Sequence, residues 1–156
     1  MKRTLLMAAL VVALIAIHAT AGSLYAQAAD VSGYWSGTTR VTPPCSFSTG
    51  RCNAINNITF RLKLSGNRIK GKYTCAYGTL NCRNGGADNT GKVVSGRLSG
   101  NEIRLSVVVP ADVSNCYYNG TLTSPTSMRG GYSCYQGGEL LEEGMWDVKQ
   151  AQAPAQ

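Results

Sequence analysis

The chain has 156 residues, 18 glycines and a formal net charge of +7, and a chain of this length holds one domain. The glycine content and the lack of a sustained helical period argue against an α-helical domain. The single histidine, His18, lies in an apolar leader, so the rest of the chain cannot supply a Ser-His-Asp triad, a histidine general base or an imidazole metal ligand.

The first 28 residues predict a signal peptide that is removed on export. Lys2-Arg3 forms a basic start, the apolar run Leu5–Ile17 follows, and Ala26–Ala28 supplies the small residues of a cleavage site. A membrane span needs about 20 apolar residues and this run has 13, so cleavage is expected. We therefore expect a periplasmic or secreted protein. The chain divides into a signal peptide at 1–28, a single β-barrel domain at 29–149 and a disordered tail at 150–156.

Short runs of alternating apolar and polar residues follow the leader, and this period of two predicts β-strands. The stretch Glu139–Glu143 also suits a short helix, but Gly144 and the β-compatible run Met145–Val148 favour a strand. The eight expected strands span approximately residues 31–41, 55–65, 68–77, 92–99, 102–109, 115–123, 127–136 and 139–149. Sequential hairpins and an even count predict an all-β fold. We expect an eight-stranded antiparallel up-and-down barrel whose first and last strands pair, which leaves no exposed edge.

A repeated segment marks two of the turns. Leu64–Lys70 (LSGNRIK) recurs 34 residues later as Leu98–Arg104 (LSGNEIR). Each copy places Gly-Asn between alternating runs, and glycine readily takes the positive φ that a tight hairpin turn requires. A third turn is expected at Ser124-Pro125.

All six cysteines follow the leader, and an even number in an exported chain predicts disulfide bonds. Residues that face each other across a turn at Ser124-Pro125 have numbers that add up to 250. Cys116 and Cys134 satisfy this condition, so we expect a cross-strand bridge between them. The remaining four leave alternatives open: Cys45 with Cys52 and Cys75 with Cys82, or Cys52 with Cys82. Their spacings are wider than the usual zinc pair, so no metal site is expected.

Four short motifs lie on the expected strands: Gly33–Gly37 (GYWSG), Gly71–Cys75 (GKYTC), Gly131–Cys134 (GYSC) and Gly144–Trp146 (GMW). On these motifs the chain resembles calycin-type barrels such as lipocalins and avidins, and more closely the small bacterial exported barrels that begin with G-x-W-x-G. The resemblance implies a fold. The chain is short for a lipocalin and has fewer inward tryptophans than an avidin site, so biotin binding is not expected.

The barrel interior is expected either to be filled by its own side chains or to hold a small, partly polar ligand. The expected inward residues are Trp35, Ile58, Phe60, Leu62, Ile69, Tyr73, Tyr77, Leu98, Ile103, Leu105, Tyr118, Leu122, Met128, Tyr132, Trp146 and Val148. The candidate ligand-binding residues are Trp35, Tyr73, Tyr118, Tyr132, Glu142 and Trp146, because tyrosine combines an apolar ring with a polar tip. Glu142 is the one inward acid, so a glycosidase pair is not supported. We expect no catalytic residues and no cofactor.

The outer face carries a basic flank, which we define as Arg61, Lys63, Lys70, Lys72, Arg97 and Arg104. Loss of Lys2 and Arg3 with the leader leaves 13 basic residues against 8 acidic ones, a net charge of +5. Such a flank attracts an anionic envelope component, or it is a solvated surface that keeps the barrel soluble. Nucleic acid is not an expected partner, since no aromatic residues alternate with the charges.

These features predict a non-enzymatic exported binding or interaction module. Its ligand would lie in the barrel or its anionic partner on the basic flank. An alternative is an inhibitor of a periplasmic protease or lysozyme, acting through the loop Pro43–Asn53, which contains Cys45 and Cys52. Lysozymes are commonly basic, so a net charge of +5 makes a protease the easier target.

Overall fold

The computed structural model describes residues 29–42, 55–76, 90–109 and 114–153. The expected signal peptide, the loop Pro43–Asn53, Tyr77 and three of the cysteines lie outside these ranges. Eight strands fill the described part: β1 (Gly33–Val41), β2 (Ile55–Ser65), β3 (Arg68–Ala76), β4 (Thr90–Ser99), β5 (Glu102–Val109), β6 (Ser114–Ser124), β7 (Ser127–Gln136) and β8 (Glu139–Ala151). Among these residues no helix is long and apolar enough to span a membrane.

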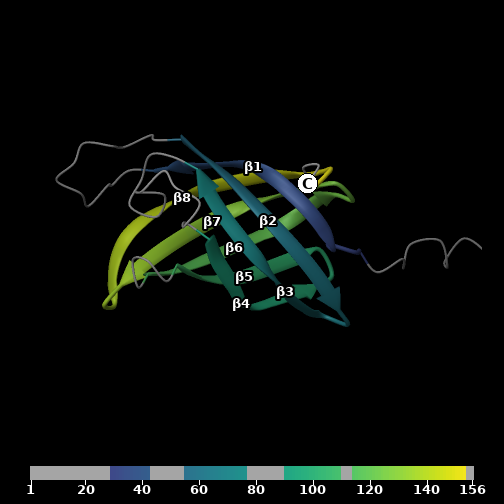
Figure 1. Ribbon diagram of the computed structural model, residues 1–156, viewed down its shortest axis with the longest axis horizontal. Coiled ribbons are helices and arrows are strands. Elements are labelled where there is room, and N and C mark those ends of the chain that lie inside the picture. The colour runs from purple at the N-terminus through teal and green to yellow at the C-terminus, as the bar shows by residue number, and fades with distance from the viewer. Residues whose placement is uncertain (1–28, 43–54, 77–89, 110–113, 154–156) are drawn as a thin grey trace, which may run out of the picture.

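The eight strands form one closed barrel in which every strand pairs with its sequence neighbours and β1 also pairs with β8 (Figure 1). All pairings are antiparallel, so the predicted up-and-down barrel is confirmed. The tight turns β2–β3, β4–β5 and β6–β7 all lie at one end, toward the right of Figure 1. We name this the turn end and the opposite one the loop end.

The strand limits differ from the expected ones at both ends of the domain. The first strand begins at Gly33 and not at 31, because Gly33 has a φ of 129°, which breaks the extended run. Val31 instead lies fully buried, and its carbonyl oxygen accepts a hydrogen bond of 2.9 Å from the Trp35 indole. The last strand runs on to Ala151, because its backbone pairs with β1 as far as Tyr34.

The turns agree closely with the expected ones. Gly66 and Gly100 have φ values of 61° and 58°, in the region that their tight turns need. The β6–β7 turn is at Pro125-Thr126, one residue beyond the expected position, and a register shift between Leu122 and Ser124 compensates for the difference.

The opposition of Cys116 and Cys134 is therefore preserved, and the predicted disulfide is confirmed with a Cα–Cα distance of 4.0 Å. Cys75 is also disulfide-bonded. The proposed pairings that involve Cys45, Cys52 and Cys82 concern residues outside the described ranges.

The start of β8 is a strand, so the helical alternative for Glu139–Glu143 is wrong. Cys134 pairs with Glu142 and Tyr135 pairs with Leu140, which leaves Leu141 as an extra residue in β8. This bulge sets the phase in which Glu142 and Trp146 both point inward.

The interior is formed by the inward residues of all eight strands. Every described member of the expected inward set is buried. Two glycines explain how the largest rings fit. A Cβ atom placed on Gly120 would lie 2.7 Å from Cζ2 of Trp146, and one on Gly144 would lie 2.8 Å from Cε1 of Tyr132. Inward glycines therefore make room for aromatic side chains of this protein.

Candidate functional site

The six residues predicted to line a ligand pocket are all buried inside the barrel: Trp35, Tyr73, Tyr118, Tyr132, Glu142 and Trp146. Several of them pack against one another. Tyr118 stacks on Tyr132 with ring centroids 5.4 Å apart, and its ring also meets those of Tyr73 at 5.7 Å and Trp146 at 5.9 Å. Phe60 contacts three of the same rings. The aromatic side chains thus form one continuous cluster around Tyr118.

Trp35 is directed elsewhere. It belongs to β1 near the turn end, and its indole N–H donates to Val31. The structure therefore brings Tyr73, Tyr118, Tyr132 and Trp146 together. The indole N–H of Trp35 instead holds the segment before β1 through its hydrogen bond to Val31.

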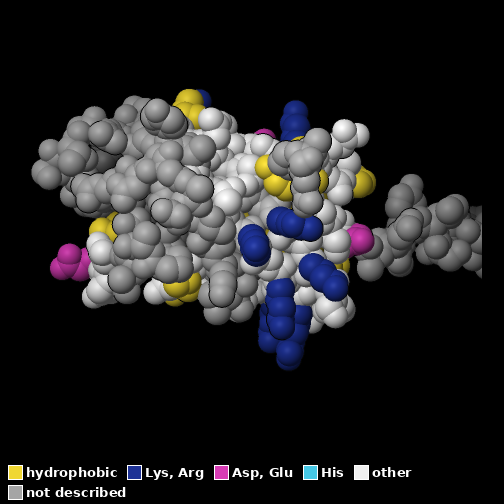
Figure 2. All heavy atoms as spheres, viewed as in Figure 1, with side chains coloured by type: hydrophobic (Ala, Val, Ile, Leu, Met, Phe, Trp, Pro, Cys, Tyr) yellow, Lys and Arg dark blue, Asp and Glu magenta, His cyan; other side chains and the backbone are white. Residues whose placement is uncertain are grey.

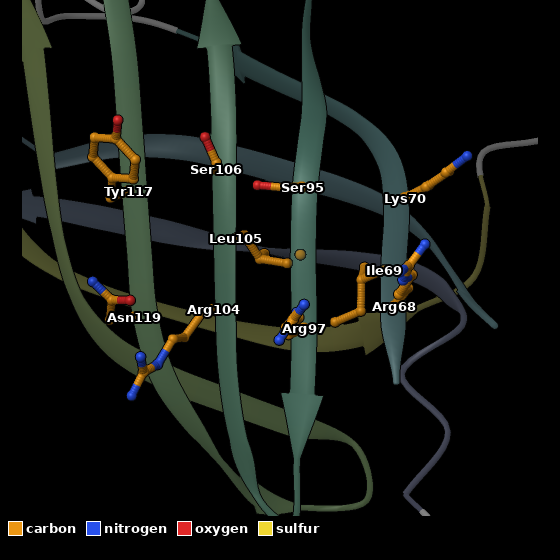
Figure 3. Close-up of a pocket in the computed structure, with 11 residues that line it drawn as sticks. Arg68, Ile69, Lys70, Ser95, Arg97, Arg104, Leu105, Ser106, Tyr117 and Asn119 are labelled. Atoms are coloured by element: carbon orange, nitrogen blue, oxygen red, sulfur yellow. The ribbon is translucent and has the colours of Figure 1, made fainter. Parts of the chain in front are cut away.

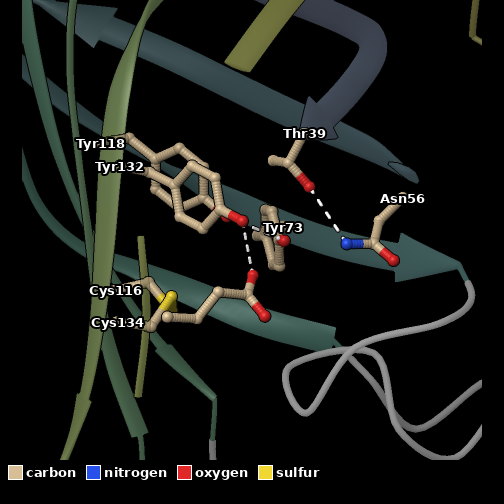
Figure 4. Close-up of a disulfide and its surroundings, with 8 residues drawn as sticks. Thr39, Asn56, Tyr73, Cys116, Tyr118, Tyr132 and Cys134 are labelled. Atoms are coloured by element: carbon tan, nitrogen blue, oxygen red, sulfur yellow. Dashed lines mark hydrogen bonds between the residues drawn. A yellow bond between two sulfur atoms is a disulfide. The ribbon is translucent and has the colours of Figure 1, made fainter. Parts of the chain in front are cut away.

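Two hydrogen bonds between side chains orient the tyrosine hydroxyls (Figure 4). The hydroxyl of Tyr118 donates to that of Tyr73 at 2.9 Å, and the hydroxyl of Tyr132 donates to Oε1 of Glu142 at 2.5 Å. Both bonds are buried, where a hydroxyl without a partner would be costly. The cluster therefore has defined polar positions in an otherwise apolar interior.

The protonation of these tyrosines follows from burial. Removal from water raises the pKa of Tyr73 well above its usual value, and the pKa of Tyr118 rises for the same reason. Burial also raises the pKa of Tyr132, and the nearby negative charge of Glu142 adds to the shift. All three hydroxyls stay neutral at physiological pH, so they can give or accept hydrogen bonds but cannot act as bases.

Polar residues are buried at the loop end as well. Thr39, Asn56, Ser114 and Glu142 all lie within a few residues of that end of their strands, and each is at most 6% exposed. The side-chain amide of Asn56 donates to the hydroxyl of Thr39 at 3.3 Å, as a dashed line in Figure 4 shows. Sequence reasoning found Glu142 through its phase with Trp146. It missed Thr39, Asn56 and Ser114, although the same alternation points them inward.

This interior arrangement offers a single carboxylate with neutral hydroxyls around it. In the described ranges no group of three or more His, Cys, Asp and Glu side chains is placed to hold a metal ion. The chemistry available to the interior is hydrogen bonding to a polar group through Glu142 and the tyrosines.

The basic flank occupies the outer surface of β2 to β5, and its six side chains are all exposed. Figure 2 shows Lys and Arg side chains gathered on the half of this face that lies toward the turn end. The strand register places like charges directly opposite each other. Lys63 faces Lys70, and Arg61 faces Lys72 across β2 and β3. Arg97 lies between two further arginines, Arg68 on β3 and Arg104 on β5.

A groove of about 680 Å³ crosses the outside of β3 to β6 next to this flank (Figure 3). Two rows of outward side chains form its polar lining. Arg68, Arg97, Arg104 and Asn119 make the first row, and Lys70, Ser95, Ser106 and Tyr117 make the second. Ile69, Gly96 and Leu105 lie beneath them.

Of the eleven groove residues, three belong to the predicted flank, namely Lys70, Arg97 and Arg104. Arg68 and Tyr117 are two of those that were missed. Arg68 follows the Gly66-Asn67 turn in phase with Lys70, so the alternation that identified Lys70 also places it outward. Tyr117 lies between two inward residues of β6 and is 44% exposed. Both signals were present in the period-two pattern, but only the register between strands shows that the two residues border one groove.

Comparison with known proteins adds no family assignment: no protein-family model matches the chain, and no curated protein matches it significantly.

Proposed function

We propose that this protein is an exported, non-enzymatic binding module that attaches to anionic surfaces or polymers through its basic flank. The observation that carries this proposal is the register of like charges. Lys63 faces Lys70, Arg61 faces Lys72, and Arg97 faces both Arg68 and Arg104. Like charges directly opposite each other destabilise a sheet. These charges therefore do not serve the stability of the fold, which favours a role in binding.

The other side of the barrel provides a comparison. Arg129 on β7 lies opposite Asp147 on β8, an arrangement of opposite charges that is favourable for folding. Solubility alone needs mixed charges of this kind. Within the described residues of the basic flank, Arg104 forms an ion pair with Glu102 at 3.6 Å, and both side chains are largely exposed. Exposed pairs of this type contribute little, so the positive potential of the flank is left available to a partner.

Sedimentation with vesicles tests this proposal. The protein should bind vesicles of phosphatidylglycerol at low salt and should not bind vesicles of phosphatidylcholine. Binding should weaken strongly between 0.1 M and 1 M salt, because the Debye length falls from about 10 Å to about 3 Å. Equal binding to both vesicles, or no binding at low salt, would refute an anion-binding flank.

A second candidate function uses the interior. Glu142 is 6% exposed and hydrogen-bonded to Tyr132 at the loop end, where Thr39 and Asn56 are also buried. A buried carboxylate among neutral hydroxyls favours a small ligand with an amine or hydroxyl group. Titration with a panel of small amines tests this candidate. Binding should change the tryptophan fluorescence of the protein, and the change should be lost in Glu142→Gln.

A further inference from the structure

We propose that the groove across β3 to β6 is a binding site for a phosphorylated saccharide. This inference rests on the proposed function, because it names the chemical group that the basic flank would recognise. Figure 3 shows the arginines along one side of the groove, and the hydroxyl-bearing side chains together with Lys70 along the other. The two rows divide the groove into an anion-binding part and a part suited to a polyhydroxylated ring.

The anion-binding part is the row of three arginines. Arg97 on β4 lies directly opposite Arg68 on β3 and Arg104 on β5, so its Cα atom is about 4.5–5.5 Å from the Cα atom of each. All three side chains are exposed, and the ion pair of Arg104 with Glu102 is of the exposed, weak kind that a ligand can displace. A guanidinium group binds oxyanions through two parallel N–H donors. Several such forks around one point suit a phosphate monoester, which has three terminal oxygens and close to two negative charges.

The second row of the groove has one charged residue, Lys70, and three residues with hydroxyl groups, Ser95, Ser106 and Tyr117. Ser95 lies opposite Ser106, and Ser106 lies opposite Tyr117 in the next pairing. Asn119 ends the arginine row beside Arg104. Hydroxyl and amide groups can each donate and accept, which matches the hydroxyls of a sugar.

Tyr117 gives the site an exposed aromatic ring. Its ring packs edge to face against that of Tyr135, with centroids 6.0 Å apart, so a neighbour supports its orientation. It remains 44% exposed. An aromatic ring with a polar tip at the edge of a polar groove offers an apolar surface for the C–H face of a sugar and a hydroxyl for its substituents.

The shape of the groove has a local cause in β4. Between β3 and β4, Gly71 pairs with Val93 but Ile69 pairs with Gly96, so β4 has one residue more than β3 over this stretch. Between β4 and β5, Val93 pairs with Val107 and Ser95 pairs with Ser106, which again leaves one extra residue in β4. Both register shifts come from one extra residue in β4, and such a bulge bends a strand and re-aims its side chains. The resulting volume of about 680 Å³ lies within the usual range for small-ligand sites, about 300–1,000 Å³. It is far larger than a phosphate ion needs, which argues for a ligand with a second part.

Calorimetric titrations of the full chain with glucose 1-phosphate, inorganic phosphate and glucose test the site. We expect glucose 1-phosphate to bind more tightly than phosphate, and glucose to bind weakest. Arg97→Ala should weaken the binding of glucose 1-phosphate and of inorganic phosphate about ten-fold or more, because a charge-assisted hydrogen bond is lost. Tyr117→Ala should lower the affinity for glucose 1-phosphate to that for inorganic phosphate, while the affinity for phosphate stays unchanged. Tyr117→Phe should keep most of the difference between the two affinities.

Arg40→Ala is the matched control, since Arg40 is an exposed arginine on β1 outside the groove. Equal affinity for glucose 1-phosphate and phosphate would overturn the saccharide site, as would equal effects of Arg40→Ala and Arg97→Ala. Tighter binding of AMP than of glucose 1-phosphate would assign the groove to nucleotides and also overturn it. If phosphatidylglycerol vesicles bind but glucose 1-phosphate does not, the groove inference fails and the proposed function stands. If glucose 1-phosphate binds but phosphatidylglycerol vesicles do not, the proposed function of the flank is refuted and the saccharide site in the groove stands.

Free sugar phosphates and glycolipid headgroups share this chemistry. Vesicles that contain lipid A, a phosphorylated diglucosamine lipid, distinguish the two sources from each other. Binding to these vesicles that is tighter than to phosphatidylglycerol vesicles of equal charge, and that glucose 1-phosphate displaces, supports a surface glycolipid. Binding of glucose 1-phosphate without this preference supports a free sugar phosphate.

Discussion

The indole N–H of Trp146 donates a hydrogen bond of 3.0 Å to the carbonyl oxygen of Gly131, and the edge of the same ring lies against Gly120. Trp146 on β8 thus reaches across β7 to β6 inside the barrel. The ring can occupy this position only because Gly120 has no side chain. A small residue on one strand therefore determines where the largest residue of another strand fits.

Gly120→Ala should destabilise the protein by about 1–3 kcal/mol, the usual effect of overpacking a core. The added methyl group would meet the Trp146 ring and the backbone of Arg129. Urea unfolding followed by tryptophan fluorescence measures the change. Gly131→Ala is the matched control, because its Cβ atom would lie 3.6 Å from the nearest atom, an ordinary contact. Equal losses in the two variants would contradict the packing of Trp146 against Gly120.

The disulfide between Cys116 and Cys134 should contribute strongly to stability. It joins residues 18 apart in sequence, and a loop of that size corresponds to about 3 kcal/mol through the reduced entropy of the unfolded chain. Replacing both cysteines with alanine should lower the free energy of unfolding by about this amount. Cys116→Ala alone should in addition leave the buried thiol of Cys134, which reacts with an alkylating reagent in the unfolded chain without prior reduction. A double variant as stable as the parent would show that the hairpin is fixed by other contacts.

The buried tyrosines predict a loss of stability at high pH. Burial raises the pKa of Tyr73 and Tyr118, whereas in the unfolded chain tyrosine titrates near pH 10. Above about pH 10 the unfolded state releases these protons and the folded state keeps them. The free energy of unfolding should then fall by about 1.4 kcal/mol per pH unit for each tyrosine. Unfolding in urea at a series of pH values measures this slope, and Tyr73→Phe should make it shallower. An unchanged slope in that variant would indicate that Tyr73 ionises while folded.

Lys70→Glu should raise stability and weaken binding to anions. The substitution places a carboxylate opposite Lys63, which replaces a repulsive cross-strand pair with an attractive one. A gain of about 0.2–1 kcal/mol in unfolding free energy is expected. Lys149→Glu on β8 is the control, because Lys149 lies opposite Ser36 and Ser127 and has no charged residue across from it in either pairing. A destabilised Lys70→Glu variant would mean that the charges of the flank do not repel each other.

The location of the anion-binding surface can be tested with charge-matched double variants. Lys63→Glu/Lys70→Glu and Arg40→Glu/Lys149→Glu change the net charge equally, and all four side chains are exposed. The first pair should abolish the sedimentation of the protein with phosphatidylglycerol vesicles. The second pair should retain most of it. Equal losses would show that binding follows net charge and not the flank.

Most of the barrel could be predicted because antiparallel pairing follows simple rules. Once the turn near Pro125 is located, the partner of every residue on β6 follows by counting, and this places Cys116 opposite Cys134. Alternation then assigns each side chain to one face, which is how Glu142 was found inside. These inferences succeed because each depends only on the position of one turn or on the alternation of residues within one strand.

The bulge in β4 and the position of Val31 could not be predicted in this way. An extra residue in a strand depends on how the whole sheet closes, and no local pattern around Val94 distinguishes it from a regular strand. Val31 continues the apolar alternation, yet it is buried through the turn at Gly33 and the indole of Trp35. The groove depends on the β4 bulge, so it too was beyond sequence reasoning.

The pairing of β1 with β8 has a consequence for the architecture of the chain. Tyr34 lies opposite Ala151, so the polypeptide enters and leaves the barrel side by side at the turn end. A short linker there could join the two ends, and the chain could be opened at the Gly137-Gly138 hairpin without changing any strand neighbour. Because the barrel is closed and each strand has two antiparallel neighbours, a circularly permuted chain that begins at another strand would form the same barrel.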